Sequence, residues 1–250
     1  MEIRKLNKSA LQEFIESDEF SKLLYLPISK HRAISHINNP RLDDEDILLS
    51  LAYIDNKMVG YIGVLPDFIF IEDNPEKIFW VSGYWVHQDY RGKKIAQTLL
   101  KNCIEDCNYR AIYTNYSPYS KRAFDKSGHF IDLKKNKGIR LYIRSDLQTI
   151  LPPKKTIYQR NKSLLKIIDW KINIILDLRL FFKKVDIDLT KYKFVTEIDS
   201  DMEQFINQKT KKYIFQRGAN ELKWIIDFPW IKDIELDIDN TKNRYNFSSF

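Results

Sequence analysis

Residues 86–96 read Val-His-Gln-Asp-Tyr-Arg-Gly-Lys-Lys-Ile-Ala, and this stretch decides the fold that we expect. It follows the apolar run 78–86, which is dense enough in apolar residues to be a central β-strand. After the stretch 86–96, apolar residues recur at helical spacing from Leu99 to Cys107. The stretch is therefore predicted to be a short basic turn between a strand and a helix.

The same turn is a candidate anion site. Backbone amides at a helix N-terminus lack helical partners and attract negative charge. Arg91, Lys93 and Lys94 add positive charge at that point. We therefore predict that the turn binds a pyrophosphate.

Upstream of the turn, the sequence alternates between helical and strand patterns. Ser9 and Gln12 form a capping box that predicts a first helix, and a less regular helical region follows at about 19–37. Residues 47–64 read as a β-hairpin that turns at Asp55-Asn56-Lys57. A polar loop at 72–77 is expected to separate this hairpin from the central strand.

Downstream, the pattern completes one α/β unit. A strand is predicted at 111–116, and Ser117 followed by Pro118 starts a short helix that ends near Lys126 before Gly128. Residues 130–143 are expected to close the sheet as a second hairpin. The fold class is therefore α/β, a mixed central sheet flanked by helices, with a first domain over residues 1–148.

The rest of the chain divides into two further parts. Residues 149–184 contain a Pro-Pro linker and a basic amphipathic helix at 161–184, and 151–184 carry nine basic residues against Asp169 and Asp177. This helix is expected to bridge two domains, with the alternative that it lies on an anionic membrane or on RNA. Residues 185–250 form a smaller α+β region.

Composition excludes several classes of protein. With 44% hydrophobic residues, 7 Gly and 8 Pro, the chain is neither collagenous nor disordered. It has no apolar run long enough for a membrane span, and its charged start does not resemble a signal peptide, so we expect a cytoplasmic protein. Cys103 and Cys107 are expected to be buried thiols, and the scattered histidines predict no metal site.

The turn and its flanks resemble a known family. Residues 86–96, followed by Leu99-Leu100, are similar to the acetyl-CoA-binding motif of the GNAT acyltransferase superfamily. In that motif a central strand ends in Val-x-Pro-x-Tyr and runs into Arg-Gly-x-Gly-x-Gly/Ala. The order of elements from 3 to 144 is also similar, and 117–130 resembles the closing motif of the family, a capped helix ending in Leu-Tyr-x-x-x-Gly-Phe.

This resemblance implies an acetyl-CoA-dependent N-acetyltransferase with a GNAT-like fold. It implies that strand backbone contacts the pantetheine arm, that the turn holds the pyrophosphate, and that the cap of the closing helix lies nearby. The residues implied for acetyl-CoA binding are Tyr84, Trp85, Val86, Arg91, Gly92, Lys93, Lys94, Ile95, Ala96, Gln97 and Ser117.

The chain departs from the family pattern at three positions. Lys94 stands where the family usually has glycine, and Gln88 replaces the usual proline. Phe124 stands where many members have a tyrosine that protonates the leaving thiolate. Tyr119 and Tyr116 are the substitutes that we consider for this acid, with Tyr119 preferred.

The general base has three candidates, Asp67, Glu72 and His87. Asp67 is preferred because it follows Pro66 between apolar residues, which favours a desolvated and fixed carboxylate. Aromatic residues on the same strands and loops suit a sugar ring, so we expect the amine of a small acceptor, such as an amino sugar, as the partner.

Two other functions stay open at this point. One is a non-catalytic acyl-CoA-binding or regulatory module, suggested by Lys94 and Phe124. The other is a tRNA-dependent aminoacyl transferase that uses the basic segment 151–184, although such an enzyme has no need of a pyrophosphate turn. We expect no nucleic-acid partner. Residues 217–224 faintly resemble bacterial acyltransferases with two GNAT units, so 185–250 is considered a partial second unit.

Overall fold

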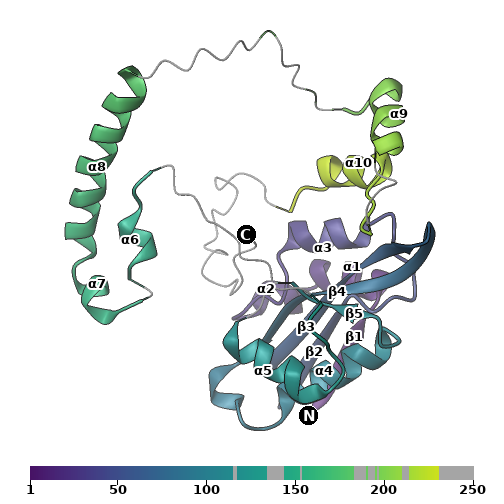
Figure 1. Cartoon of the computed structure of the whole chain (residues 1–250). Helices are drawn as coiled ribbons and strands as arrows, with labels where there is room; N and C mark the ends of the chain where they lie inside the picture. Colours follow the sequence, from purple (N-terminus) through teal and green to yellow (C-terminus); the bar gives the residue numbers. More distant parts are fainter. Residues whose placement is uncertain are drawn as a thin grey trace. The chain divides into compact units, whose positions relative to one another are not determined.

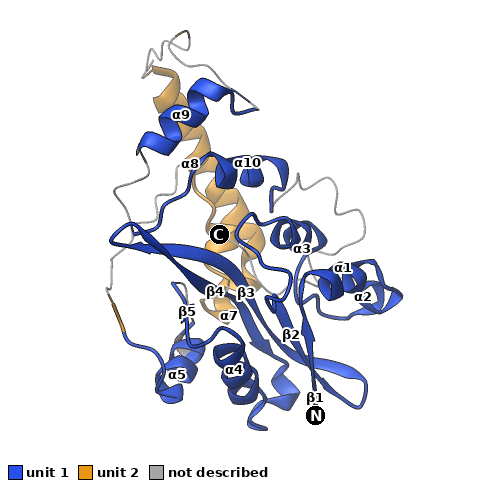
Figure 2. Cartoon of the chain, turned by 90° about the vertical axis from the view of Figure 1, so that its right-hand side faces the viewer, with its two compact units in different colours: residues 1–131, 195–250 blue, residues 132–194 orange. Residues whose placement is uncertain are grey.

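A computed structural model of the chain describes residues 1–114, 117–133, 144–152, 154–182, 190, 195, 197–209 and 214–230 (Figure 1). The chain divides into two compact units, one made of residues 1–131 with 195–250 and the other of residues 132–194 (Figure 2). The three-part division predicted from the sequence remains a prediction.

The first unit contains a mixed five-stranded sheet, which confirms the predicted fold class. Strands β1 to β4 pair with antiparallel neighbours, and β5 runs parallel to β4. The strands, in sheet order, are β1 (Glu2–Leu6), β2 (Leu49–Ile54), β3 (Lys57–Ile71), β4 (Asn74–Val86) and β5 (Ala111–Ile112).

Helices cover both faces of this sheet (Figure 1). One face packs against α1 (Lys8–Glu16), α2 (Asp18–Lys22) and α3 (Lys30–Ile37), with Leu11 and Leu51 fully buried between them. The other face packs against α4 (Ile95–Asp106) and α5 (Pro118–Ser127). As predicted, Cys103 and Cys107 of this second core are buried free thiols.

The N-terminal part differs from the prediction in three ways. Strand β1 was not expected from the sequence. Helix α1 is capped by Asn7, whose side chain accepts from the amide of Ala10 at 3.1 Å, so the predicted cap at Ser9 is wrong. The helical region predicted at 19–37 is two helices, and the interval between them contains Pro27, which has no amide hydrogen for a helical bond.

The two hairpin turns use left-handed backbone. Asp55 and Asn56 have φ of 49° and 59°, which confirms the first turn. The loop predicted at 72–77 is wrong, because Glu72 and Asp73 alone make the turn with φ of 50° and 65°. Two residues of this conformation match the twist of antiparallel strands, so β4 begins at Asn74 and pairs with β3 along the whole hairpin.

Helix α5 confirms the predicted start and end. Ser117 caps it by accepting from the amide of Ser120 at 3.1 Å, and Gly128 ends it with φ of 73°. Of the predicted strand 111–116, residues 111–112 form β5, and 115–116 lie outside the described residues. The predicted hairpin 130–143 falls mostly on residues 134–143, which also lie outside them.

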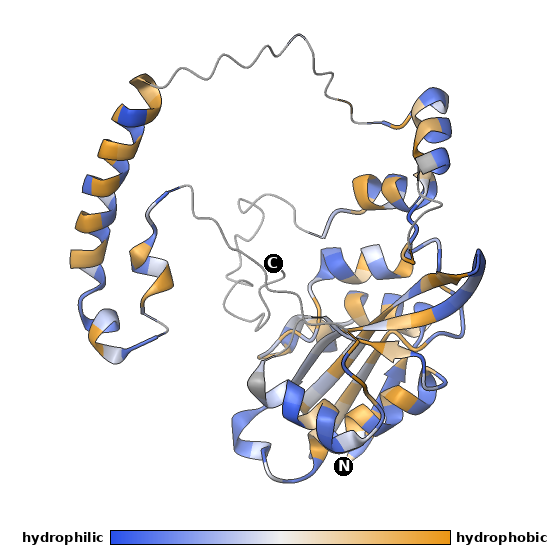
Figure 3. Ribbon diagram, in the orientation of Figure 1, coloured by the Kyte–Doolittle hydropathy of each residue, from blue (hydrophilic) through white to orange (hydrophobic). Residues whose placement is uncertain are grey.

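The second unit confirms the long helix expected near 161–184. It holds α6 (Leu147–Ile150), α7 (Thr156–Arg160) and α8 (Lys162–Phe182). Asp169 of α8 accepts from the amides of Leu147 and Gln148 at 2.8 and 2.9 Å. These two bonds connect the start of α6 to the polar side of α8. Apolar residues make up much of the rest of α8 (Figure 3). The bridging role of α8 remains a prediction.

No helix in the part of the chain that the structure describes has the length and apolar character needed to span a bilayer.

Residues after 195 return to the first unit. They include α9 (Ser200–Lys209), which confirms the helix expected from about Asp201, and α10 (Ala219–Asp227). Of the strand-like stretch predicted at 193–195, residues 193–194 lie outside the described residues. The amide of Phe70 donates to the carbonyl of Ile214 at 2.8 Å. The indole of Trp224 donates to the carbonyl of Ser35 at 2.7 Å, so α10 docks on α3.

An ion pair strengthens this docking and gives the first testable prediction. The Glu221 carboxylate binds Arg41 at 2.9 Å and accepts from the amide of Gly218 at 2.6 Å, with the Arg41 side chain only 7% exposed. Removing Glu221 takes away the carboxylate to which the buried Arg41 Nε and the Gly218 amide donate, while Arg41 keeps its ion pair with Asp67. We expect Glu221→Ala to lower the free energy of unfolding by about 2 kcal/mol, measured by urea denaturation.

The control is Glu203→Ala on α9. Glu203 pairs with Lys223 at 2.9 Å, but both side chains are about 40% exposed. An exposed ion pair contributes roughly 0–1 kcal/mol to stability, so the free energy of unfolding of this variant should stay close to that of the unmodified chain. Equal losses in the two variants would contradict the docking role of Glu221.

Candidate active site

The centre of the sheet contains a bulge in β4. Ile62 of β3 pairs with Tyr84 and Val64 pairs with Val81, so Ser82 and Gly83 together stand opposite one residue, Gly63. A bulge of this kind bends its strand. Gly83 has φ of 100°, which only glycine adopts without strain.

Beyond the bulge, β4 diverges from β5. The two strands pair only at Phe79 with Ala111 and at Trp80 with Ile112. Within the described residues, positions 81–86 of β4 have no strand partner on that side. Their backbone polar groups can therefore pair with an extended ligand, as a strand edge pairs with an added strand.

The end of β4 leads directly into the basic turn. A short 3₁₀ segment, Gln88–Tyr90, is followed by Gly92 with φ of 82° and Lys94 with φ of 62°. Lys94 is the N-cap of α4 and makes no side-chain capping bond. The first amides of α4 are thus left for another acceptor, and Arg91, Lys93 and Lys94, all exposed, lie just before them in the chain.

Tyr84 connects the strand to this helix. Its hydroxyl donates to the carbonyl of Ala96 at 2.7 Å, and burial raises the pKa of the Tyr84 hydroxyl. The ring of Tyr84 lies 5.8 Å from that of Phe124, which stacks on Tyr113 at 4.0 Å. Phe124 is 2% exposed, so the position of the family's usual acid is filled by a ring with no proton to donate.

The structure brings most of the predicted acetyl-CoA residues together at the end of β4. Tyr84, Trp85 and Val86 form that end of the strand, and positions 91–97 form the turn and the first turn of α4. The hydroxyl of Ser117 caps α5 and lies 2.9 Å from that of Ser120. Tyr119 is on the first turn of α5 with its side chain 85% exposed, and Tyr116 lies outside the described residues.

The preferred base, Asp67, has a different environment from the one expected. Its side chain is desolvated, at 4% exposure, as the sequence suggested. It accepts from Arg41, from the Trp80 indole at 2.8 Å, from the amide of Phe68 at 2.9 Å and from Arg217 at 3.4 Å. Both carboxylate oxygens are therefore engaged, which suits a structural ion pair better than a base.

The other two base candidates lie at opposite ends of β4. Glu72 is in the exposed turn between β3 and β4. His87 follows Val86 directly, and its ring lies 5.3 Å from Tyr25 and 5.8 Å from Trp85. Only His87 is at the end of the strand that carries the turn.

A second group of polar residues, on α3 and just after it, was missed in the sequence. Arg32, Ser35, His36, Asn39 and Arg41 are each less than 9% exposed. Arg32 donates to Ser82 of the bulge, and its Nε donates to His36 Nε2 at 3.4 Å. Asn39 donates to the carbonyl of Pro66 at 2.7 Å. Arg32, Ser35 and His36 are spaced i, i+3 and i+4, which places them on one face of α3, and that was the signal available in the sequence.

His36 is the least satisfied of these groups. Burial, with a smaller contribution from Arg32, holds the pKa of His36 well below its ordinary value, so the ring is neutral at pH 7. Its Nδ1 is buried and has no hydrogen-bond partner among the described residues. Buried polar atoms are rarely left unpaired, so this face of α3 is a candidate for function.

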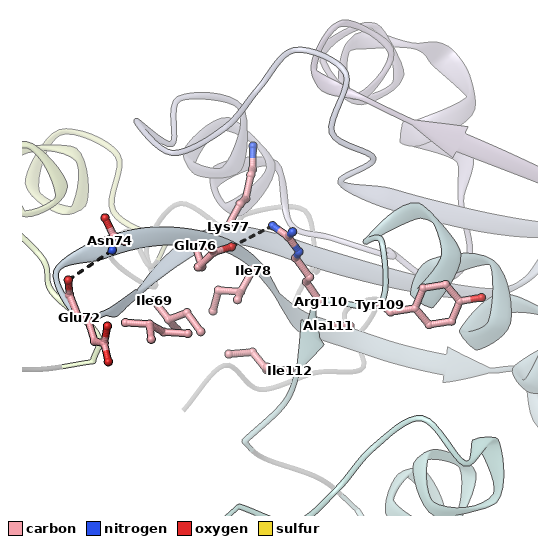
Figure 4. Close-up of a pocket in the computed structure, with 11 residues that line it drawn as sticks. Ile69, Glu72, Asn74, Glu76, Lys77, Ile78, Tyr109, Arg110, Ala111 and Ile112 are labelled. Atoms are coloured by element: carbon pink, nitrogen blue, oxygen red, sulfur yellow. Dashed lines mark hydrogen bonds and ion pairs between the residues drawn. The ribbon is translucent and has the colours of Figure 1, made fainter.

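A pocket among the described residues lies elsewhere (Figure 4). It has a volume of about 490 Å³ and lies at the start of β4, where Glu76 pairs with Arg110 at 3.3 Å and Ile78 faces Ile112. It is at the opposite end of the strand from Val86, so it is not the acetyl-CoA site predicted from the sequence. Among the described residues no three metal-ligating side chains cluster.

One family model matches part of the chain. A family model described as the acetyltransferase (GNAT) family matches residues 9–128. A comparison with curated proteins gives no match.

Several solved structures are similar to the first part of the chain. Glucosamine-6-phosphate N-acetyltransferase from Arabidopsis thaliana is 19% identical, with 56% of this chain and 95% of that chain covered and a TM-score of 0.38. Ribosomal-protein-alanine N-acetyltransferase from Brucella melitensis is 17% identical, with coverages of 56% and 100% and a TM-score of 0.36. The aminoglycoside N-acetyltransferase AAC(6')-Iy in complex with CoA is 14% identical, with coverages of 56% and 99% and a TM-score of 0.38.

The backbone of the turn gives a second prediction. Lys94 has φ of 62° and ψ of 11°, a left-handed conformation that strains an L-residue and suits glycine. Glycine relieves the strain at this position but also adds conformational entropy to the unfolded chain. We expect the balance of these two effects in Lys94→Gly to raise the free energy of unfolding by up to about 1 kcal/mol. Thermal and urea unfolding measure this.

Lys93→Gly is the matched control. Lys93 is not among the residues with positive φ, so glycine there only increases the entropy of the unfolded chain and should destabilise. An equal loss of stability in both variants would show that Lys94 does not adopt the left-handed conformation in the folded chain.

Proposed function

We propose that the chain transfers an acetyl group from acetyl-CoA to the primary amine of an amino sugar, a proposal supported by the match of residues 9–128 to the acetyltransferase (GNAT) family model. The observation that carries the proposal is the strand end that opens at the bulge and leads into an uncapped helix N-terminus. This arrangement suits a ligand with an extended amide-containing arm and a pyrophosphate.

The residues at this strand end fit acetyl-CoA. The amides from Gly92 to Gln97 would hold the pyrophosphate, with Arg91, Lys93 and Lys94 as counter-charges. Backbone groups of 81–86 would pair with the pantetheine arm. Acetyl-CoA supplies the activated acetyl group when bound. The bond from Tyr84 to Ala96 keeps strand and helix in register for both parts of the ligand.

The transfer requires a polarised carbonyl and two proton movements. A bond forms between the amine nitrogen and the carbonyl carbon, the carbon–sulfur bond breaks, the nitrogen loses a proton and the sulfur gains one. Backbone N–H groups of β4 after the bulge are the donors that we assign to the carbonyl oxygen.

For the two proton transfers we retain one candidate base and one candidate acid. His87 is the base candidate at the end of β4, since Asp67 has both oxygens engaged and Glu72 is at the far turn. Tyr119 is the acid candidate, because its hydroxyl is exposed on the first turn of α5 while Phe124 has none.

Aromatic side chains support a sugar as the acceptor. Three aromatic rings lie together near the end of β4: the ring centroid of Trp85 is 5.1 Å from that of Tyr25 and 5.6 Å from that of Tyr61. These rings are on the side of the sheet that carries α1 to α3, away from α4. Tyr61 is fully buried, whereas Tyr25 and Trp85 are partly exposed. Aromatic faces pack on the carbon-bound hydrogens of a sugar ring, so Tyr25 and Trp85 suit an amino sugar.

Gly92→Pro tests the acetyl-CoA site. Proline fixes φ near −65° where the structure has 82°, and it removes an amide donor. We expect the affinity for acetyl-CoA, measured by calorimetry, to fall at least about tenfold. Asn56→Pro, a similar distortion in the turn between β2 and β3, should leave it unchanged. Unchanged affinity in a folded Gly92→Pro variant would overturn the site.

Tyr119→Phe tests the acid. If Tyr119 protonates the leaving thiolate, we expect the variant to lower kcat at least about tenfold. Tyr109→Phe removes another exposed hydroxyl and should have no effect. A kcat within about twofold of the unmodified enzyme from pH 6 to 9 would show that Tyr119 is not the acid.

A further inference from the structure

The bulge gives the two faces of β4 different partners. Ser82 accepts from Arg32 of α3, whereas the Tyr84 hydroxyl binds Ala96 of α4. Helix α3 and helix α4 cover opposite faces of the sheet. The α4 face carries the pyrophosphate turn, so the α3 face is the one from which a second substrate can approach the bulge.

The α3 face at this point is polar where a helix packed on a sheet is normally apolar. Arg32, Ser35 and His36 are buried at 8%, 0% and 1% exposure. Trp230 packs over them: its ring lies 4.7 Å from the Arg32 guanidinium and 5.6 Å from the His36 ring, and its indole donates to Ser35 Oγ at 2.8 Å. Trp230, which follows α10, therefore contacts the same Arg32 that binds the bulge.

The groups on this face are mainly hydrogen-bond donors. Arginine can only donate, so the bond from Arg32 to His36 Nε2 requires the proton of the neutral imidazole to be on Nδ1. That Nδ1–H is buried and has no partner in the part of the chain that the structure describes. A face with a guanidinium, an unpaired N–H and an indole ring suits a ligand that offers oxygen atoms and a ring.

We propose that Arg32 and Trp230 form the acceptor-binding wall of the enzyme, with His36 as a positioning residue that holds Arg32 against the bulge. Arg32 binds hydroxyl or anionic oxygens of the acceptor sugar, and Trp230 lies against its ring. This inference rests on the proposed function and names the residues that select the acceptor. It also makes residues 214–230 part of the catalytic domain.

The experiment compares four variants in the full chain. Arg32→Gln removes the charge, Arg32→Lys keeps it, Trp230→Phe keeps an aromatic ring without the indole N–H, and His36→Gln removes the imidazole. His31→Gln on the same helix is the control, because His31 is only half-buried and contacts none of this cluster in the described structure. Thermal unfolding identifies the variants that fold.

Each folded variant is assayed with glucosamine, galactosamine, glucosamine 6-phosphate and kanamycin, and with spermidine and an alanine-starting peptide as acceptors without an amino sugar. We expect Arg32→Gln to raise KM for the preferred sugar at least about tenfold, and Arg32→Lys and Trp230→Phe about threefold or more. His36→Gln should raise KM for the acceptor with kcat retained, which a general loss of structure would not do. The affinity for acetyl-CoA should stay unchanged.

The outcomes separate this inference from the proposed function. If the unmodified chain does not bind acetyl-CoA, the proposed function fails. If it binds acetyl-CoA but acetylates only spermidine or the peptide, or no acceptor, the sugar-binding wall is wrong. If it acetylates a sugar and KM stays within about twofold in the folded Arg32 and Trp230 variants, the assignment of these residues is overturned.

Discussion

The bulge in β4 opposite Gly63 is the constraint on which the rest of the structure depends. A side-chain carbon at Gly63 would lie 2.9 Å from the carbonyl oxygen of Ser82, so the two strands approach closely only because this residue is glycine. The extra residue bends β4 away from β5 and leaves the edge of 81–86 without a strand partner in the described residues. The turn, the opened edge and the α3 contacts with Ser82 all follow from this bend.

A second constraint is the Asp67 ion pair, which holds the acceptor side together. Arg41 binds Asp67 and Glu221, and Arg217 reaches Asp67 from the C-terminal region. The cluster thus joins β3, the segment after α3 and α10. Its burial requires every charge to be paired, because an unpaired charge in this position would be strongly destabilising. The carboxylate that the sequence favoured as a base is instead the centre of this network.

The sequence predicted the parts of the fold that depend on local pattern. The strand, turn and helix at 78–107, the turn at Asp55, the cap at Ser117 and the long α8 all follow from spacing and from turn or cap residues. The short β1 was missed because its five residues carry little periodicity. The buried face of α3 was missed because partners from β4 and α10, distant in the sequence, are what bury it.

The polar face of α3 is best understood as a compromise between stability and function. Apolar residues at Arg32 and His36 would fill the same space without unpaired donors, and replacing buried polar groups in this way is often stabilising. The chain keeps instead a neutral imidazole whose N–H has no partner within the described residues, next to the Arg32 that binds the bulge. Buried polar groups that reduce stability are expected where a protein binds or reacts with a ligand. Because the bulge opens the strand at Ser82, the place where this compromise occurs is also the place where two substrates would have to meet.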